Sequence, residues 1–166
     1  MRDLSKNILI VLLALVLVLM DSSFFTLFAM NGISVISSFA ALIIVALLNS
    51  RSNFIIFSLS LILFLTIFSS LSPIFIIFAF FVVPAVVLFL RQNYLPEPSI
   101  MFSLVYFVFG FVFLGSFLIL YGNNLSVVLA RLLLQFVALN SVTGLLFYYL
   151  TIRSRNYLQP GKQIRL

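Results

Sequence analysis

Six apolar stretches, separated by short polar ones, organise this chain. They predict helices over residues 4–23, 33–48, 54–68, 74–90, 100–121 and 125–152, followed by a basic tail over 153–166. About 20 residues in a helix rising ~1.5 Å each cross the ~30 Å hydrocarbon core of a bilayer. The pattern therefore predicts an all-α membrane protein with six transmembrane helices, packed as a compact bundle in a single polytopic domain over residues 1–166.

Some of these lengths leave alternatives open. The second and third stretches have only 16 and 15 residues, so they need flanking polar residues or a locally thinned bilayer. Residues 24–30 either continue the first helix or lie along the membrane interface. No small-x-small motif follows the first stretch, so it is expected to stay uncleaved.

The last apolar stretch holds most of the polar side chains that lie well inside an apolar segment. These are Arg131, Gln135, Asn140, Ser141 and Thr143. Each unpaired polar group facing lipid costs free energy, so this segment is predicted to be the inner helix of the bundle. At ~100° per residue, Arg131 and Gln135 share one helix face and Asn140 lies roughly opposite. These residues are candidates for partner binding or for polar contacts within the bundle.

Three of the polar candidates have two interpretations each. Asp21 and Arg131 either pair across the bundle near its outer face or are hydrated separately at the interface, where Arg131 can extend to water. Asn140 falls near the bilayer centre. It either bonds a neighbouring helix, worth about 0.6–2 kcal/mol, or lines a groove for a partner.

Pro84 lies inside the fourth apolar stretch. Proline has no backbone N–H, and its ring clashes with the carbonyl four residues earlier. It therefore predicts a helix kink that leaves the carbonyl of Phe80 without its helical donor.

The basic residues predict the orientation. Eight of the nine Lys and Arg residues fall at the termini or in alternate connections, while residues 21–32, 69–73 and 122–124 contain none. Cytoplasmic loops carry the excess of Lys and Arg, so both termini are predicted to be cytoplasmic. Arg51, Arg91, Arg153 and Arg155 are expected to hold this orientation and to touch anionic lipid, with docking of a cytoplasmic partner by the tail as the alternative.

Composition narrows the function. The chain is 64% hydrophobic and 7% charged, and it has no Cys and no His. The dispersed cations do not suggest nucleic-acid binding, and disulfides are excluded. Three carboxylates in separate segments offer neither a catalytic pair nor a metal cluster. An enzyme is not expected, and no cofactor is predicted.

Two phrases resemble the rod shape-determining protein MreD family. LVLVLMDSSFF resembles the first helix of that family, and LLLQFVALNSVTGLLFYYLTIRSR resembles its last. Thr66 stands where the third helix of the family often has an Asp. The resemblance implies a non-enzymatic scaffold of the bacterial cell-elongation machinery in the cytoplasmic (inner) membrane. It would bind a single-span MreC-like partner and, through it, cytoskeletal and peptidoglycan-synthesis components.

The runner-up is the substrate-binding S-component of an energy-coupling-factor vitamin transporter, which shares the expected six-helix fold. Those subunits usually show an Ala-xxx-Ala surface on the first helix, whereas Ala14 here stands alone among Leu and Val. An unassigned small membrane protein is the remaining alternative.

Overall fold

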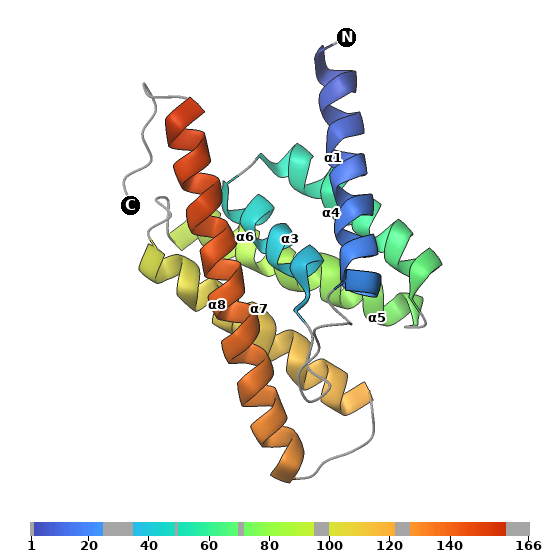
Figure 1. The fold of residues 1–166 in the computed structure, drawn as a ribbon, viewed down its shortest axis with the longest axis vertical. Helices are drawn as coiled ribbons and strands as arrows, with labels where there is room; N and C mark the ends of the chain where they lie inside the picture. The colour runs from blue at the N-terminus through green and yellow to red at the C-terminus, as the bar shows by residue number, and fades with distance from the viewer. Residues whose placement is uncertain are drawn as a thin grey trace.

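The computed structural model describes residues 2–24, 35–48, 50–69, 72–94, 100–121 and 127–158. Nearly all of these are helical and none is in a strand, so the all-α prediction is confirmed. The elements are α1 (Arg2–Leu19), η1 (Met20–Phe24), α3 (Ser37–Leu48), α4 (Arg51–Phe68), α5 (Pro73–Ile77), η2 (Phe78–Val82), α6 (Val83–Tyr94), α7 (Ile100–Tyr121) and α8 (Val127–Leu158). The turns η1 and η2 are π-helical. The first turns of α1 and the last turns of α8 both lie towards the upper side of Figure 1.

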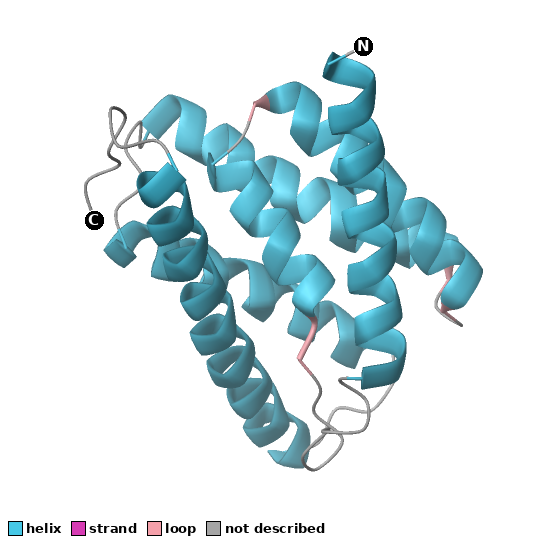
Figure 2. Cartoon of the chain, turned by 45° about the horizontal axis from the view of Figure 1, so that its top comes forward, coloured by secondary structure: helices cyan, strands magenta, loops and turns pink. Residues whose placement is uncertain are grey.

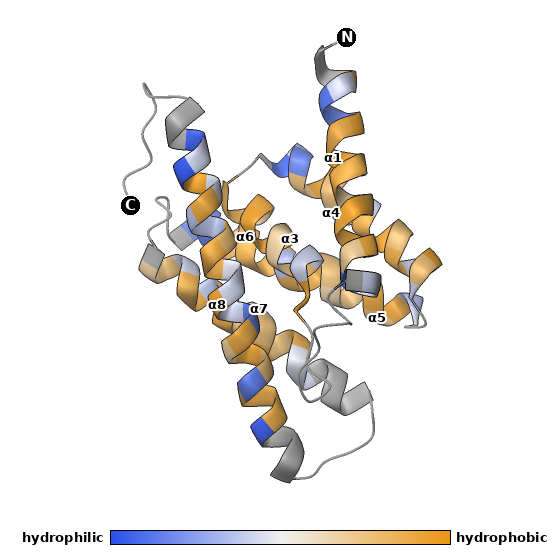
Figure 3. Ribbon diagram, in the orientation of Figure 1, coloured by the Kyte–Doolittle hydropathy of each residue, from blue (hydrophilic) through white to orange (hydrophobic). Residues whose placement is uncertain are grey.

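Four helices are long and apolar enough to cross a membrane. They cover Leu4–Ser23, Arg51–Phe68, Pro73–Asn93 and Arg131–Arg155. Two further apolar helical stretches are shorter, Ser37–Leu48 in α3 and Met101–Ser116 in α7. Figure 3 shows hydrophobic residues along most of the helices. Hydrophilic ones lie near the start of α1, near the start of α4 and in both halves of α8. This distribution is compatible with a multi-pass membrane protein.

The inner helix of the bundle is α3, and the prediction that the last apolar stretch holds this place is wrong. α3 contacts α1, α4, α6, α7 and α8, and ten of its residues are buried. Figure 2 shows it between the N-terminal helix and the C-terminal helix. α8 instead lies at the edge of the bundle, and most of its side chains between Arg131 and Arg155 are not buried. Its polar residues are divided between a buried face and an exposed one.

The helix ends differ from the predicted ranges in several places. α3 begins at Ser37, after non-helical residues 35–36, and α4 begins at Arg51 rather than Phe54. The fourth helix starts at Pro73 and runs to Tyr94. Helical backbone also continues through Arg153 and Arg155 to Leu158, where a tail was predicted. Polar residues can occupy a helical turn in water, so the limits of the apolar stretches do not mark the helix ends. Residues 25–34 and 159–166 lie outside the described part of the chain.

A hydrogen-bond donor from another helix compensates for the backbone N–H that Pro84 lacks. The π-helical turn η2 comes immediately before α6, which contains Pro84 in a buried position. The carbonyl of Phe80 accepts a hydrogen bond from the Ser58 hydroxyl on α4, at 2.8 Å in a buried setting. Ser58 therefore supplies the donor that Pro84 lacks, and this bond joins α4 to the fourth helix.

α7 and α8 approach each other closely at Gly144. A Cβ atom at this position would lie 2.7 Å from two ring atoms of Phe107. The Phe107 ring is fully buried and lies edge-on to Tyr148, with centroids 6.4 Å apart. Glycine therefore permits the helix contact that orients the inward face of α8.

Candidate functional site

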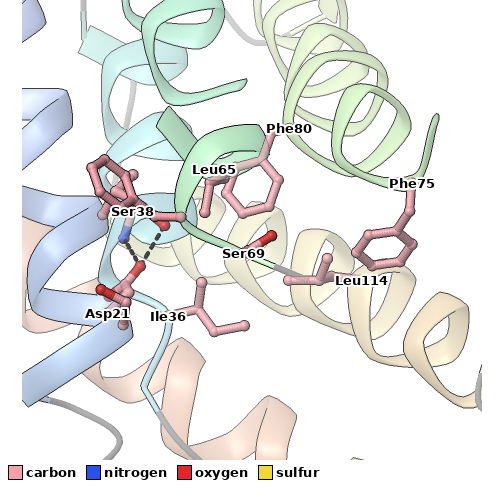
Figure 4. Close-up of a pocket in the computed structure, with 11 residues that line it drawn as sticks. Asp21, Ile36, Ser38, Leu65, Ser69, Phe75, Phe80 and Leu114 are labelled. Atoms are coloured by element: carbon pink, nitrogen blue, oxygen red, sulfur yellow. Dashed lines mark hydrogen bonds between the residues drawn. The ribbon is translucent and has the colours of Figure 1, made fainter. Parts of the chain in front are cut away.

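The N-terminal end of α3 is held by the carboxylate of Asp21. Oδ1 accepts hydrogen bonds from the backbone N–H and the hydroxyl of Ser37, at 2.8 and 2.6 Å. Oδ2 accepts from the backbone N–H of Ser38 at 2.9 Å and from the Ser38 hydroxyl. Figure 4 shows Asp21 facing Ser38. The two oxygens thus receive four hydrogen bonds from two successive residues.

Asn140 of α8 bonds the same end of α3. Its Oδ1 accepts a hydrogen bond from the backbone N–H of Ile36 at 2.8 Å, and its Nδ2 donates to the carbonyl of Phe136 at 3.0 Å. The side chain of Asn140 is fully buried. The first helical bond within this segment runs from Ala40 N–H to Ile36 O. Asp21 and Asn140 therefore satisfy three of the four amides that precede this bond, those of residues 36–38.

This arrangement matches the electrostatics of a helix end. Unpaired N–H groups give a helix N-terminus a partial positive charge, and a carboxylate there is stabilising. Away from water, an unsatisfied backbone group costs several kcal/mol. The Asp21–Asn140 pair allows α3 to begin inside the bundle rather than in water.

Two arginines donate hydrogen bonds to carbonyls at the C-terminal end of α3. Arg91 of α6 donates from Nη1 to the carbonyl of Ala46 at 3.0 Å. Arg155 of α8 donates from Nη1 to the carbonyl of Leu48 at 3.1 Å. Cations are favourable at a helix C-terminus, where the last carbonyls have no helical partner. Side chains from α6, α8 and the α1–η1 segment thus hold both ends of one short helix.

A small chamber lies beside Asp21. It has a volume of about 180 Å³ and is lined by α1, η1, α3, α4, α5, η2, α7 and the residues next to them. Figure 4 shows Phe75, Phe80, Leu65 and Leu114 around it, with the hydroxyl of Ser69 nearby. Ligand pockets usually have ~300–1,000 Å³. The chamber can hold a few water molecules, but it is smaller than a typical small-molecule site.

The remaining polar candidates of α8 lie in different environments. Arg131 and Gln135 are exposed on the outside of the helix. Thr143 donates to the carbonyls of Leu139 and Asn140 on its own helix. Ser141 is buried, and its hydroxyl has no hydrogen-bond partner in the described part of the structure.

The orientation arginines also differ from one another. Arg51 bonds the side-chain oxygen of Gln92 through Nε at 2.9 Å and through Nη2. Arg153 is exposed on α8. Arg91 and Arg155 are committed in part to α3, so these two are helix caps as well as surface cations.

The structure brings together Asp21 and Asn140 but not Asp21 and Arg131. Both carboxylate oxygens of Asp21 are bonded to serines, and Arg131 is exposed nine residues before Asn140, about 14 Å of helix rise. The sequence did not predict Ser37 and Ser38 as the donors to Asp21, nor Ser58 as the donor to the Phe80 carbonyl. The two serines could have been found, because serine at the start of an apolar stretch is a helix N-terminal signal.

Comparison with known proteins adds no relative: no family model, curated protein or solved structure matches this chain. Within the described residues there is no group of three or more His, Cys, Asp or Glu side chains that could hold a metal ion.

Proposed function

We propose that this protein is a non-enzymatic scaffold of the bacterial cell-elongation machinery in the cytoplasmic membrane. Its six helices cross the membrane with both termini inside, and it binds the transmembrane helix of a single-span MreC-like partner. Through that partner it is linked to peptidoglycan synthesis and the cytoskeleton. The proposal combines the sequence resemblance with the way the structure uses its polar side chains.

The observation that carries the proposal is the exposed face of α8. Arg131, Gln135 and Val142 fall on one side of the helix and are all exposed, Val142 by 65%. Gln135 lies one helical turn inside the start of the membrane-length segment at Arg131. A polar side chain on a lipid-facing surface is unfavourable and gains about 0.6–1.7 kcal/mol from an interhelical hydrogen bond. This face is suited to a second transmembrane helix that offers a polar group to Gln135.

The other intramembrane polar groups support a scaffold over a catalyst. Asp21 and Asn140 are bonded to the backbone of α3, as are Arg91 and Arg155 at its other end. Groups committed to helix ends position the bundle and are not directed at a substrate. The cations near the C-terminal end of α3 also lie together, as a common cytoplasmic side for the chain termini requires.

The vitamin-transporter alternative receives less support. The chamber beside Asp21, at about 180 Å³, is below the usual range for ligand sites. A larger groove of about 450 Å³ between α1 and α8 has an almost wholly apolar lining, whereas ligand sites also hold several polar groups that orient the ligand. Ala14 is fully buried against the bundle, so it does not form the exposed alanine surface that S-components use for their coupling subunit.

Site-specific photo-cross-linking in the native membrane tests the proposal. A photoreactive residue at Val142 of the full chain should capture a single-span protein, which a C-terminal tag and mass spectrometry would identify. Leu63 on α4, 59% exposed, is the matched control position and should capture far less. An ATPase pair with a coupling subunit, or equal capture at both positions, would refute the scaffold interpretation.

A pair of substitutions separates binding from folding. Gln135→Leu should weaken partner binding about three- to twentyfold and leave the thermal stability of the purified chain unchanged, since Gln135 is exposed. Asn140→Leu should instead lower that stability, because it leaves the N–H of Ile36 unsatisfied. Normal partner recovery with Gln135→Leu would remove this face from the interface.

A further inference from the structure

An apolar groove separates α1 from α8. Its walls are Leu13, Leu17 and Met20 on the α1 side and Phe147 and Thr151 on α8, and its volume is about 450 Å³. Its floor is a partly buried side of α3, formed by Ser37, Ala41, Ile44 and Val45, with Phe57 of α4 beneath. Figures 1 and 2 show α1 and α8 standing apart on either side of α3. This groove lies on a different side of α8 from the face with Gln135 and Val142.

A second, shallower hollow along α1 meets the groove at Leu13 and extends towards the N-terminal end of that helix. It has a volume of about 410 Å³ and is lined by Ser5, Lys6, Leu9, Ile10 and Leu13. Leu13 belongs to both hollows. From Lys6 to Met20 the two hollows follow α1 for about 21 Å. Half of the bilayer core is about 15 Å, so the path is long enough for one acyl chain of the inner leaflet.

The path formed by the two hollows runs between α1 and α8. On each of these helices a cation lies near the end that contains Lys6 on α1 and Arg155 on α8. Lys6 closes the α1 wall and is exposed. On α8, Phe147, Thr151 and Arg155 follow at four-residue spacing and share one face, so Arg155 stands one turn beyond the groove lining. Arg155 gives one N–H group to Leu48, and a guanidinium has five. The carboxylate of Asp21 lies beyond the other end of α1, in η1.

We propose that this path is a binding site for an anionic phospholipid of the inner leaflet. Its phosphate lies between Lys6 and Arg155, and one acyl chain runs along α1 past Leu13 and over α3 towards Ser37. Basic pockets between transmembrane helices on the cytoplasmic side are typical sites of anionic headgroups. The charge is confined to the inner end and the walls beyond it are apolar, which is the polarity of a lipid molecule. The site requires both termini to be cytoplasmic, but it is independent of any protein partner.

Native mass spectrometry of the full chain in detergent tests the headgroup site. Dioleoyl phosphatidylglycerol should bind in preference to dioleoyl phosphatidylcholine. Lys6→Gln and Arg155→Gln should each weaken phosphatidylglycerol binding about fivefold, since each cation near an anionic headgroup contributes about 1 kcal/mol. Arg153→Gln is the matched control, because Arg153 is exposed two residues away on the roughly opposite side of α8. Equal binding of the two lipids would overturn the proposal.

The acyl-chain path needs its own variants, because Arg155 also caps α3. Leu13→Trp should block the shared part of the two hollows and reduce phosphatidylglycerol binding. Leu12→Trp should not, because Leu12 lines neither hollow although its exposure, 53%, is close to the 50% of Leu13. Unchanged binding in Leu13→Trp would refute the path. Capture of a protein helix by a photoreactive residue at Leu13 would assign the groove to a protein instead.

Discussion

At the scale of single residues, Asp21 joins two helices through both oxygens of one carboxylate. It lies in the first turn of η1 and accepts its hydrogen bonds from the start of α3. Helix α3 is thereby capped by a residue that precedes it in the chain by sixteen positions. A local N-cap residue would bond one or two amides, whereas here Asp21 and Asn140 together bond three.

Removing the Asp21 carboxylate should destabilise the protein. Asp21→Ala leaves two amides and two hydroxyls without their acceptor, so we expect a loss of about 1–3 kcal/mol in the free energy of unfolding. Thermal or denaturant unfolding of the purified chain in detergent measures this loss. Ser22→Ala is the control, because Ser22 is exposed and its hydroxyl bonds the neighbouring Leu19 carbonyl. A stability of Asp21→Ala equal to that of the control would contradict the capping role.

Sequence alone could select Asp21 and Asn140 but not their common target. Both stand out because few polar residues interrupt the apolar stretches. The amides of residues 36–38 are main-chain groups, which no residue type reveals. The exposed positions of Arg131 and Gln135 follow from helical periodicity relative to Asn140, so that part of the candidate site was predictable from the sequence.

At the scale of elements, Pro84 makes the fourth helix depend on its neighbour α4. The π-helical turn η2 and the bond from Ser58 to Phe80 together accommodate the missing N–H. Proline inside a helix therefore adds an interhelical contact here.

A double-mutant cycle should reveal this dependence. Ser58→Ala should cost about 1–3 kcal/mol in the free energy of unfolding, because the buried carbonyl of Phe80 loses its donor. In a chain that already carries Pro84→Ala, the new backbone N–H can bond that carbonyl, so Ser58→Ala should cost less. Unfolding measurements on the wild type, both single variants and the double variant give the coupling energy. Additive effects would show that Ser58 does not compensate for Pro84.

The pattern of apolar residues located the helices but could not rank their burial. All six stretches are apolar around most of their circumference, so none shows which side faces protein and which faces lipid. α3 becomes central because it is short and its two ends are bonded from outside. Those bonds come from residues 21, 91, 140 and 155, which are distant in the sequence.

At the scale of the whole molecule, three of the described arginines gather around the C-terminal end of α3. Arg91 and Arg155 cap that helix, and Arg51 bonds Gln92, the neighbour of Arg91. Asp21 lies at the other end. The loop charges predict that the end with these arginines faces the cytoplasm.

Single cysteines can test the orientation, since the chain has no natural cysteine. Ser5→Cys and Ser154→Cys should resist a membrane-impermeant maleimide added outside intact cells, whereas Ser22→Cys and Ser72→Cys should react. Permeabilised cells provide the control, because Ser5→Cys and Ser154→Cys should then be labelled. Labelling of either of these two in intact cells would place a terminus outside and contradict six crossings with both ends cytoplasmic.

The capping of α3 also has a consequence for biosynthesis. Asp21 is synthesised before α3. Arg91 is synthesised after α3, near the end of the second helix that follows it. Asn140 and Arg155 arrive only with α8, the last helix in the described part of the chain. The core helix of this protein is thus synthesised early, and its ends stay incompletely bonded until α8 follows.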